Sequence, residues 1–213
     1  MDVFNGKKVV GLSVLPKTDV GKVESEIKAY LGDDVVIKRV KNDPINRESV
    51  TFPVVMRYLD LKAVKKGAAV WFGHTKGNSH TNRKLEDVTR LWANACYHFT
   101  LDKVYQEFAL EALGRGYAVA GPFRRFGHQR NFPPQQYAFH FSGTFYWLNA
   151  EQFFSSDWKK LVKVHRYGIE ALPGILFPPE LSICTFGDRI KDLYKIEIWN
   201  KLLDKKLLEL LSK

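Results

Sequence analysis

The chain has 213 residues, of which 45% are hydrophobic and 14% aromatic. This is enough apolar material to bury the core of one domain, and it excludes a fully disordered protein. A surplus of 33 Lys and Arg over 23 Asp and Glu gives a net charge of +10, which attracts polyanions such as nucleic acid, an anionic membrane or phosphorylated substrates without selecting among them.

The first third of the chain has the pattern of alternating strands and helices. Asp19 suits a helix N-cap and Gly32 a helix end. We expect strands at 7–15, 34–40 and 68–72, and helices at 19–30 and 48–61. This alternation predicts βαβ units, and therefore an α/β fold with a mostly parallel central sheet in a single domain spanning 1–213.

The rest of the chain is richer in helical segments. Residues 85–113 predict one bent helix or two, and 124–136 predict a loop. We expect short strands at 117–120 and 139–148, the latter broken at Gly143, a helix at 151–164 and an irregular segment at 173–179. Residues 191–213 predict an amphipathic closing helix, which packs on the domain or else contacts a membrane surface or a partner.

No apolar run is long enough to cross a bilayer, and the first residues lack the basic and then apolar pattern of a signal peptide. We therefore expect a cytoplasmic protein, of a bacterial cell or a phage-infected host.

Polar residues follow the predicted strands at their carboxyl ends, where open α/β sheets bind ligands. Lys76 offers a point charge for a phosphate, and the glycines beside it let a ligand approach the backbone. A plain polar turn after a strand is the alternative. The donor-binding candidates from these ends are Ser13, Asn42, Asp43, His74, Thr75, Lys76 and Gly77.

A second segment, 139–150, combines aromatic residues with Ser142 and Gly143 in the middle of a predicted strand. Aromatic side chains on both faces of a strand are typical of a core. The serine and glycine indicate a bulge or a close approach by a ligand, and His140 adds a titratable group.

The pairing of WFGHTKG at 71–77 with HFSGTFYWLNAEQF at 140–153 resembles a glycosyltransferase-like family of bacteria and viruses. The resemblance covers about 68–154 and is fainter at the N-terminus and at 166–174. It implies a GT-A type fold, a Rossmann-like α/β sandwich with a nucleotide-sugar cleft at the strand ends. It also implies sugar transfer from a nucleotide-sugar, with a UDP-sugar as the expected donor.

The resemblance also implies roles for individual residues. That fold usually carries Asp-x-Asp, which holds a divalent metal on the donor diphosphate, and this sequence has no such motif. Either Lys76 replaces the metal, or His74 ligates one with help from elsewhere. Ser142 and Gly143 are expected to line the pocket for the donor sugar, or else the acceptor pocket. Glu170 is the candidate base for acceptor activation, and Asp87 is the second candidate.

Segment 124–132 interleaves basic and aromatic residues, which suits a nucleic acid or another anionic acceptor, or else a solvated loop. The acceptor-binding candidates are Arg124, Arg125, His128, Arg130, His140, Tyr146 and Trp147. Arg124 and Arg125 are also possible helpers at the diphosphate. Two acceptors stay open: a surface glycan, and a hydroxymethylated base in viral DNA. The rival function is a non-catalytic nucleic-acid-binding protein, which the missing Asp-x-Asp favours.

Overall fold

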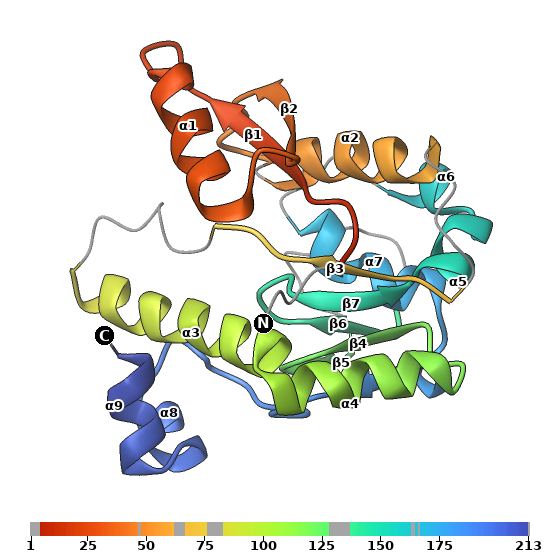
Figure 1. The fold of residues 1–213 in the computed structure, drawn as a ribbon. Coiled ribbons are helices and arrows are strands. Elements are labelled where there is room, and N and C mark those ends of the chain that lie inside the picture. Colours follow the sequence, from red (N-terminus) through yellow and green to blue (C-terminus); the bar gives the residue numbers. More distant parts are fainter. Residues whose placement is uncertain are drawn as a thin grey trace. The chain divides into compact units, whose positions relative to one another are not determined.

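The computed structural model describes residues 5–46, 48–61, 67–75, 83–127, 137–162, 165 and 167–212 (Figure 1). The chain divides into two compact units, Met1–Val64 with Val162–Ile169, and Lys65–Leu161 with Glu170–Lys213. The sequence predicts a single domain, and that stays a prediction. No helix in the described part of the chain is both long and apolar enough to cross a membrane.

The first unit is built on a βαβ motif, as the sequence predicts. β1 (Val9–Val14) and β2 (Val36–Lys41) pair in parallel, with α1 (Val20–Leu31) between them in the chain. The Asp19 side chain caps α1 by accepting from the backbone N–H of Lys22 at 3.0 Å. α2 (Glu48–Leu61) packs against β1, where the missing side chain of Gly11 makes room for Thr51.

The second unit contains a four-stranded sheet in the order β3 (Ala69–Phe72), β7 (Tyr146–Asn149), β4 (Val119–Gly121), β8 (Ser182–Cys184). β7 runs antiparallel to both of its neighbours, whereas β4 and β8 are parallel. The α/β class is confirmed, but the expected mostly parallel sheet is wrong at β7. β5 follows β4 and pairs antiparallel with β6, which leads into β7, so β7 runs back beside β4 in the opposite direction.

The helical segment expected at 85–113 is two helices, α3 (Arg83–Leu101) and α4 (Lys103–Gly114), which confirms the second of the two alternatives. Asp102 interrupts it by adopting an extended backbone and acting as the N-terminal boundary of α4. α4 packs against β4 and β7 (Figure 1). The core cluster of the unit is aromatic and joins α3 to the C-terminal segment; its largest members are Trp92, Phe99, Phe123, Phe145 and Trp199.

A short ribbon begins where the sequence predicts only a loop. β5 (Arg124–Phe126) pairs antiparallel with β6 (Phe139–Phe141). The predicted strand 139–148 is therefore two strands, β6 and β7, separated at Gly143 as expected. Helix α7 (Gly168–Leu176) extends into the segment predicted to be irregular, with Pro173 inside it. The burial of its apolar residues offsets the helix-breaking tendency of the proline.

The other predicted helices are also divided. α5 (Ala150–Ser155) and α6 (Trp158–Leu161) stand in place of 151–164, and η1 (Pro179–Leu181) precedes β8. The C-terminal segment forms α8 (Ile196–Leu202) and α9 (Lys205–Leu211). Trp199, Leu203 and Leu211 are buried in the core cluster, and Asn94 of α3 donates to the backbone carbonyl of Leu211 at 2.8 Å. The amphipathic tail therefore packs on its own unit.

Candidate functional site

One edge of the four-stranded sheet gathers the segments that carry the two sequence motifs. β3, β4 and β8 end at this edge, and the reversed strand β7 begins there. The residues after β3, Gly73 to Thr75, therefore meet the turn that precedes β7, Ser142 to Phe145. This is the edge at which open α/β sheets bind ligands.

His74 joins the two motifs directly. Its Nε2 lies 2.9 Å from the carbonyl oxygen of Gly143, a residue 69 positions further along the chain. Its ring packs against that of Phe145 with centroids 5.5 Å apart. The hydroxyl of Tyr97 on α3 donates to the backbone carbonyl of His74 at 3.3 Å. The sequence predicts that His74 and Gly143 share a site, and their positions agree.

Both nitrogens of the His74 ring lie close to backbone carbonyl oxygens. Nδ1 lies 3.1 Å from the carbonyl oxygen of Thr75, and Nε2 faces the carbonyl of Gly143. A carbonyl oxygen only accepts hydrogen bonds, and neutral histidine has a single N–H, so a neutral ring donates to one of these carbonyls and a protonated ring can donate to both.

The turn before β7 is tight and conformationally strained. Gly143 has φ 106°, and Thr144, which is β-branched, has φ 63°. Left-handed backbone is unfavourable for threonine, and such residues persist where the surrounding structure holds them. The backbone N–H of Thr144 donates to Phe141 at 3.1 Å, and that of Ser142 donates to Phe123 at 3.1 Å. The turn is thus fixed to β6 and to the residue that precedes β5.

Glu170 reaches the same turn from α7. Its Oε1 accepts a hydrogen bond from the backbone N–H of Gly143 at 3.3 Å, and its side chain is half-buried. Gly174, one helical turn later on the same face, lies directly on β6: a Cβ there would sit 1.8 Å from the carbonyl oxygen of Phe139. The glycine lets α7 approach β6 closely enough for Glu170 to contact the turn.

His140 supports this turn from the interior. It is fully buried, and its Nε2 lies 3.4 Å from the hydroxyl oxygen of Ser142, which is itself buried. Burial, and secondarily the positive charge of Arg125, lower the pKa of His140 to about 3, so its ring is neutral at physiological pH. His140 therefore supports the turn from inside the protein, and its expected acceptor contact stays a prediction.

Tyr146 and Trp147 also lie in the interior rather than at an acceptor surface. Tyr146 is fully buried beside Phe72 and Phe141. The indole N–H of Trp147 donates to the buried carbonyl of Thr100 at 2.9 Å. The aromatic side chains of β7 fill the core on both faces of the sheet, and the expected acceptor role of these two residues stays a prediction.

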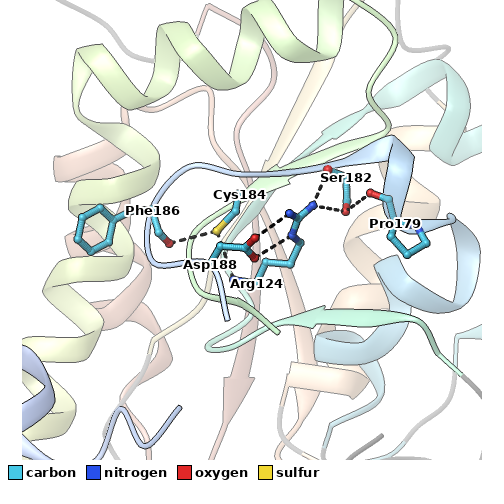
Figure 2. Close-up of polar contacts among 6 residues, drawn as sticks. All are labelled: Arg124, Pro179, Ser182, Cys184, Phe186 and Asp188. Carbon is cyan, nitrogen blue, oxygen red and sulfur yellow. Dashed lines mark hydrogen bonds and ion pairs between the residues drawn. The ribbon is translucent and has the colours of Figure 1, made fainter. Parts of the chain in front are cut away.

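Arg124 is held by contacts within the protein (Figure 2). Its Nε and Nη2 donate to the two carboxylate oxygens of Asp188 at 3.1 and 3.0 Å. Its Nη1 donates to the carbonyl and hydroxyl oxygens of Ser182 at 2.6 and 2.8 Å. This guanidinium ties β5 to β8 and to the segment after it, which is a structural role, and its expected ligand contact stays a prediction.

Cys184 belongs to the same network. Its thiol donates to the carbonyl of Phe186 at 3.2 Å, as Figure 2 shows, and its burial raises its pKa to about 11. The thiol therefore stays protonated and unreactive at physiological pH.

Asp87 and Arg125 occupy more peripheral positions. Asp87 is exposed on α3, where its Oδ1 accepts from Arg90 at 3.0 Å, an ordinary pair one helical turn apart. Its expected role as second candidate for the base stays a prediction. Arg125 is half-buried opposite His140 in the ribbon.

The polar residues of the first unit gather at the carboxyl ends of β1 and β2, as predicted. The hydroxyl of Ser13 donates to Oδ1 of Asn42 at 3.0 Å. Asp43 accepts from the backbone N–H groups of Ile45 and Asn46 at 3.0 Å. Hydrogen bonds from Asn46 lower the pKa of the Asp43 carboxyl. Asp43 therefore shapes the loop after β2.

Four of the candidates, Lys76, Gly77, His128 and Arg130, lie outside the described residues, and their roles stay predictions. Within the described ranges, no group of three or more His, Cys, Asp or Glu side chains is placed to hold a metal ion. Tyr97 and Thr144 were missed as parts of the site. The sequence held no signal for Tyr97, which lies in the middle of a long helical pattern.

In comparisons with known proteins, the chain matches no family model, no curated protein and no solved structure.

Proposed function

We propose that the protein is a glycosyltransferase that moves a sugar from a nucleotide-sugar to an acceptor hydroxyl. One observation carries the proposal. His74 and Glu170, from distant parts of the chain, contact the carbonyl and the N–H of the same glycine, Gly143, at the ligand-binding edge of the sheet. The resemblance in the sequence assigns a donor role to the first and an acceptor role to the second, and the geometry brings both together.

The donor side of the site needs positive charge. When the sugar leaves its nucleotide, the departing diphosphate gains negative charge, and a fixed cation stabilises it. The His74 imidazole, held between two carbonyl oxygens at 2.9 and 3.1 Å, is suited to that task when both nitrogens carry protons. Lys76 is the further cation that the sequence predicts. A bound divalent metal would supply the same stabilisation, and His74 is then a candidate ligand if one of its ring nitrogens gives up its contact with a carbonyl oxygen.

The acceptor side needs a base. Glu170 has a carboxylate that is half-buried, and its hydrogen bond to Gly143 orients it toward the turn. A carboxylate in this position can take the proton from an acceptor hydroxyl as that oxygen attacks the sugar. Ser142 is buried within the same turn and supports its shape.

Donor binding is tested by thermal stabilisation with a panel of nucleoside diphosphates and nucleotide-sugars, each with Mg²⁺, with Mn²⁺ and with EDTA. A bound nucleotide at one hundred times its Kd stabilises the folded protein by about 2.7 kcal/mol, which gives a clear rise in Tm. We expect a uridine nucleotide to give the largest rise. If none of these compounds raises Tm under any metal condition, the transferase proposal fails.

The His74→Ala variant separates a donor contact from a general effect on folding. It should lose most of the nucleotide-dependent rise in Tm while keeping its own cooperative melt. Lys206→Ala on α9 removes one positive charge from an exposed position and serves as the matched control. An equal loss in both variants would mean that only the overall charge of the protein attracts the nucleotide.

A further inference from the structure

An exposed cluster of aromatic and basic side chains lies beyond the sheet edge, on the ribbon and the loop after β8. The Phe126 side chain keeps 38% of its surface exposed. The guanidinium carbons of Arg124 and Arg189 each lie 4.9 Å from the centre of its ring. We define the surface patch as Phe126 and Arg189, since Arg124 is committed to Asp188 and Ser182.

The two arginines differ in how their charge is used. Arg124 is neutralised by the paired oxygens of Asp188. Arg189 is exposed and forms no ion pair within the described part of the chain. Its planar guanidinium rests on an aromatic ring and still presents donors to solvent, the arrangement that proteins use to stack a base and to contact a phosphate.

Arg189 lies in a backbone conformation that is unfavourable for arginine. Arg189 has φ 62°, a left-handed conformation that favours glycine, and its N–H donates to the carbonyl of Arg124 at 2.7 Å. Gly187, with φ 70°, lies so close to Phe123 that a Cβ would be 2.8 Å from that ring. These contacts fix the loop on β5. They hold Arg189 in a backbone conformation that costs less free energy for glycine than for arginine.

The patch lies near the candidate site along the same ribbon. The carbonyl of Phe123 accepts from the N–H of Ser142, and Phe126 is three residues further along. At about 3.4 Å per residue in an antiparallel strand, the patch lies about 10 Å from the Gly143 turn.

We infer that Phe126 and Arg189 bind an unpaired segment of nucleic acid, with a base stacked on the patch and a phosphate on Arg189. Charge complementarity supports this partner, because the protein carries +10 overall and the Arg189 guanidinium has no ion-pair partner among the described residues. That the patch binds nucleic acid does not depend on the proposed function. That this nucleic acid is the acceptor rests on the proposed function, and it favours a nucleic acid base over a glycan as the acceptor.

The test is fluorescence anisotropy with a labelled single-stranded oligonucleotide and the full chain, without any sugar donor. Arg189→Ala should weaken binding about tenfold, and it should reduce the steepness of log Kd against log salt by about 0.7. Lys206→Ala removes the same charge elsewhere and should change Kd less than about twofold. Phe126→Ala should weaken binding, and Phe126→Trp should preserve it.

The Arg189→Gly variant separates a loss of nucleic acid binding from a loss of folding stability. Glycine accepts the left-handed backbone, so this variant should melt at the same temperature as the wild type or higher, and yet lose the same affinity as Arg189→Ala. Equal affinity losses for Arg189→Ala and Lys206→Ala would overturn the inference. So would a wild-type protein that binds a neutral glycan but not the oligonucleotide.

The binding assay contains no sugar donor, so its outcome does not depend on transferase activity. The inference about nucleic acid binding therefore holds even if the transferase proposal fails. Conversely, nucleotide-sugar turnover without any role for Arg189 would leave the transferase in place and remove the nucleic acid acceptor.

Discussion

Glu170 contacts Gly143 through a bond that either a carboxylate or an amide can accept, and this allows its structural and chemical roles to be separated. Glu170→Gln should keep the bond and the stability but lower turnover about 100-fold or more, since an amide cannot act as the base. Glu170→Ala should lose turnover and about 1–3 kcal/mol of stability, because it leaves a buried N–H without that partner.

Turnover and urea unfolding measured on the same samples decide between these roles. Glu180→Gln, an exposed acid in η1, is the control and should change neither quantity. If Glu170→Gln turns over at the wild-type rate, Glu170 holds the turn without acting as the base.

The lowered pKa of buried His140 predicts that the folded protein loses stability in acid. The unfolded chain takes up a proton at this residue near pH 6.5, but the folded protein takes it up only near pH 3. The unfolded state therefore binds more protons between these values, and stability falls as the pH drops from 6.5 toward 3. Each pH unit in this interval lowers the free energy of unfolding by up to about 1.4 kcal/mol.

Urea unfolding of the wild type and His140→Gln at pH 7 and pH 5 measures this effect. The wild type should lose about 2 kcal/mol more than the variant over that interval, since glutamine does not titrate. Equal losses would show that His140 takes up its proton in the folded state as readily as in the unfolded chain.

At the level of residues, the sequence predicts the placement of the site better than its membership. His74 and Gly143 were expected to share a site because both belong to the motifs that resemble the glycosyltransferase-like family, and Glu170 was expected there as the base that the resemblance implies. Tyr146 and Trp147 belong to the same motif, yet they are buried. The residue pattern of a strand that is covered on both faces does not reveal which aromatic side chains contact a ligand.

Helix α7 is the element that carries Glu170, and its position depends on one glycine. A methyl group at Gly174 would overlap the backbone of Phe139, so Gly174→Ala must push α7 away from β6. We expect a loss of about 2–3 kcal/mol of stability, together with reduced turnover as Glu170 moves.

Gly114→Ala is the matched control for this effect. Gly114 ends α4 with open space around its Cα, so alanine there should be neutral or stabilise the helix by up to about 1 kcal/mol. A similar stability for both alanine variants in urea unfolding would contradict the close packing of α7 on β6.

The C-terminal helices should behave as part of the core. Trp199→Ala on α8 should cost about 3–5 kcal/mol, because its side chain is fully buried and its indole N–H donates to Leu193 at 2.9 Å. Leu210→Ala on α9 should cost less than about 0.5 kcal/mol, since 59% of that side chain is exposed. Urea unfolding of both variants makes the comparison, and equal small losses would mean that the tail does not complete the core.

At the level of elements, the sequence predicts the first unit well and the second less well. β1, α1, β2 and α2 follow local signals such as the Asp19 cap. The missed elements depend on tertiary contacts: β5 is a strand because it pairs with β6, and α7 continues past Pro173 because its apolar face is buried. Local propensity does not record such distant partners.

For the whole molecule, the net charge of +10 fits both the proposed enzyme and a protein that only binds nucleic acid. An enzyme and a binding protein would both attract nucleic acid, and they differ only in whether a reaction follows. An enzyme must couple the donor side at His74 to the acceptor side at Glu170, whereas a binding protein needs only the patch at Phe126 and Arg189. Charge and affinity measurements alone do not separate them.

The most direct measurement is mass spectrometry of acceptors after incubation with nucleotide-sugars and divalent metal. The acceptors are single-stranded and duplex DNA carrying hydroxymethylated bases, and a surface glycan. We predict that the wild type adds the mass of one sugar residue to an acceptor, and that His74→Ala and Glu170→Gln do not. An unchanged acceptor mass with every donor, from a protein that still binds the DNA, would contradict the transferase and leave a nucleic-acid-binding protein.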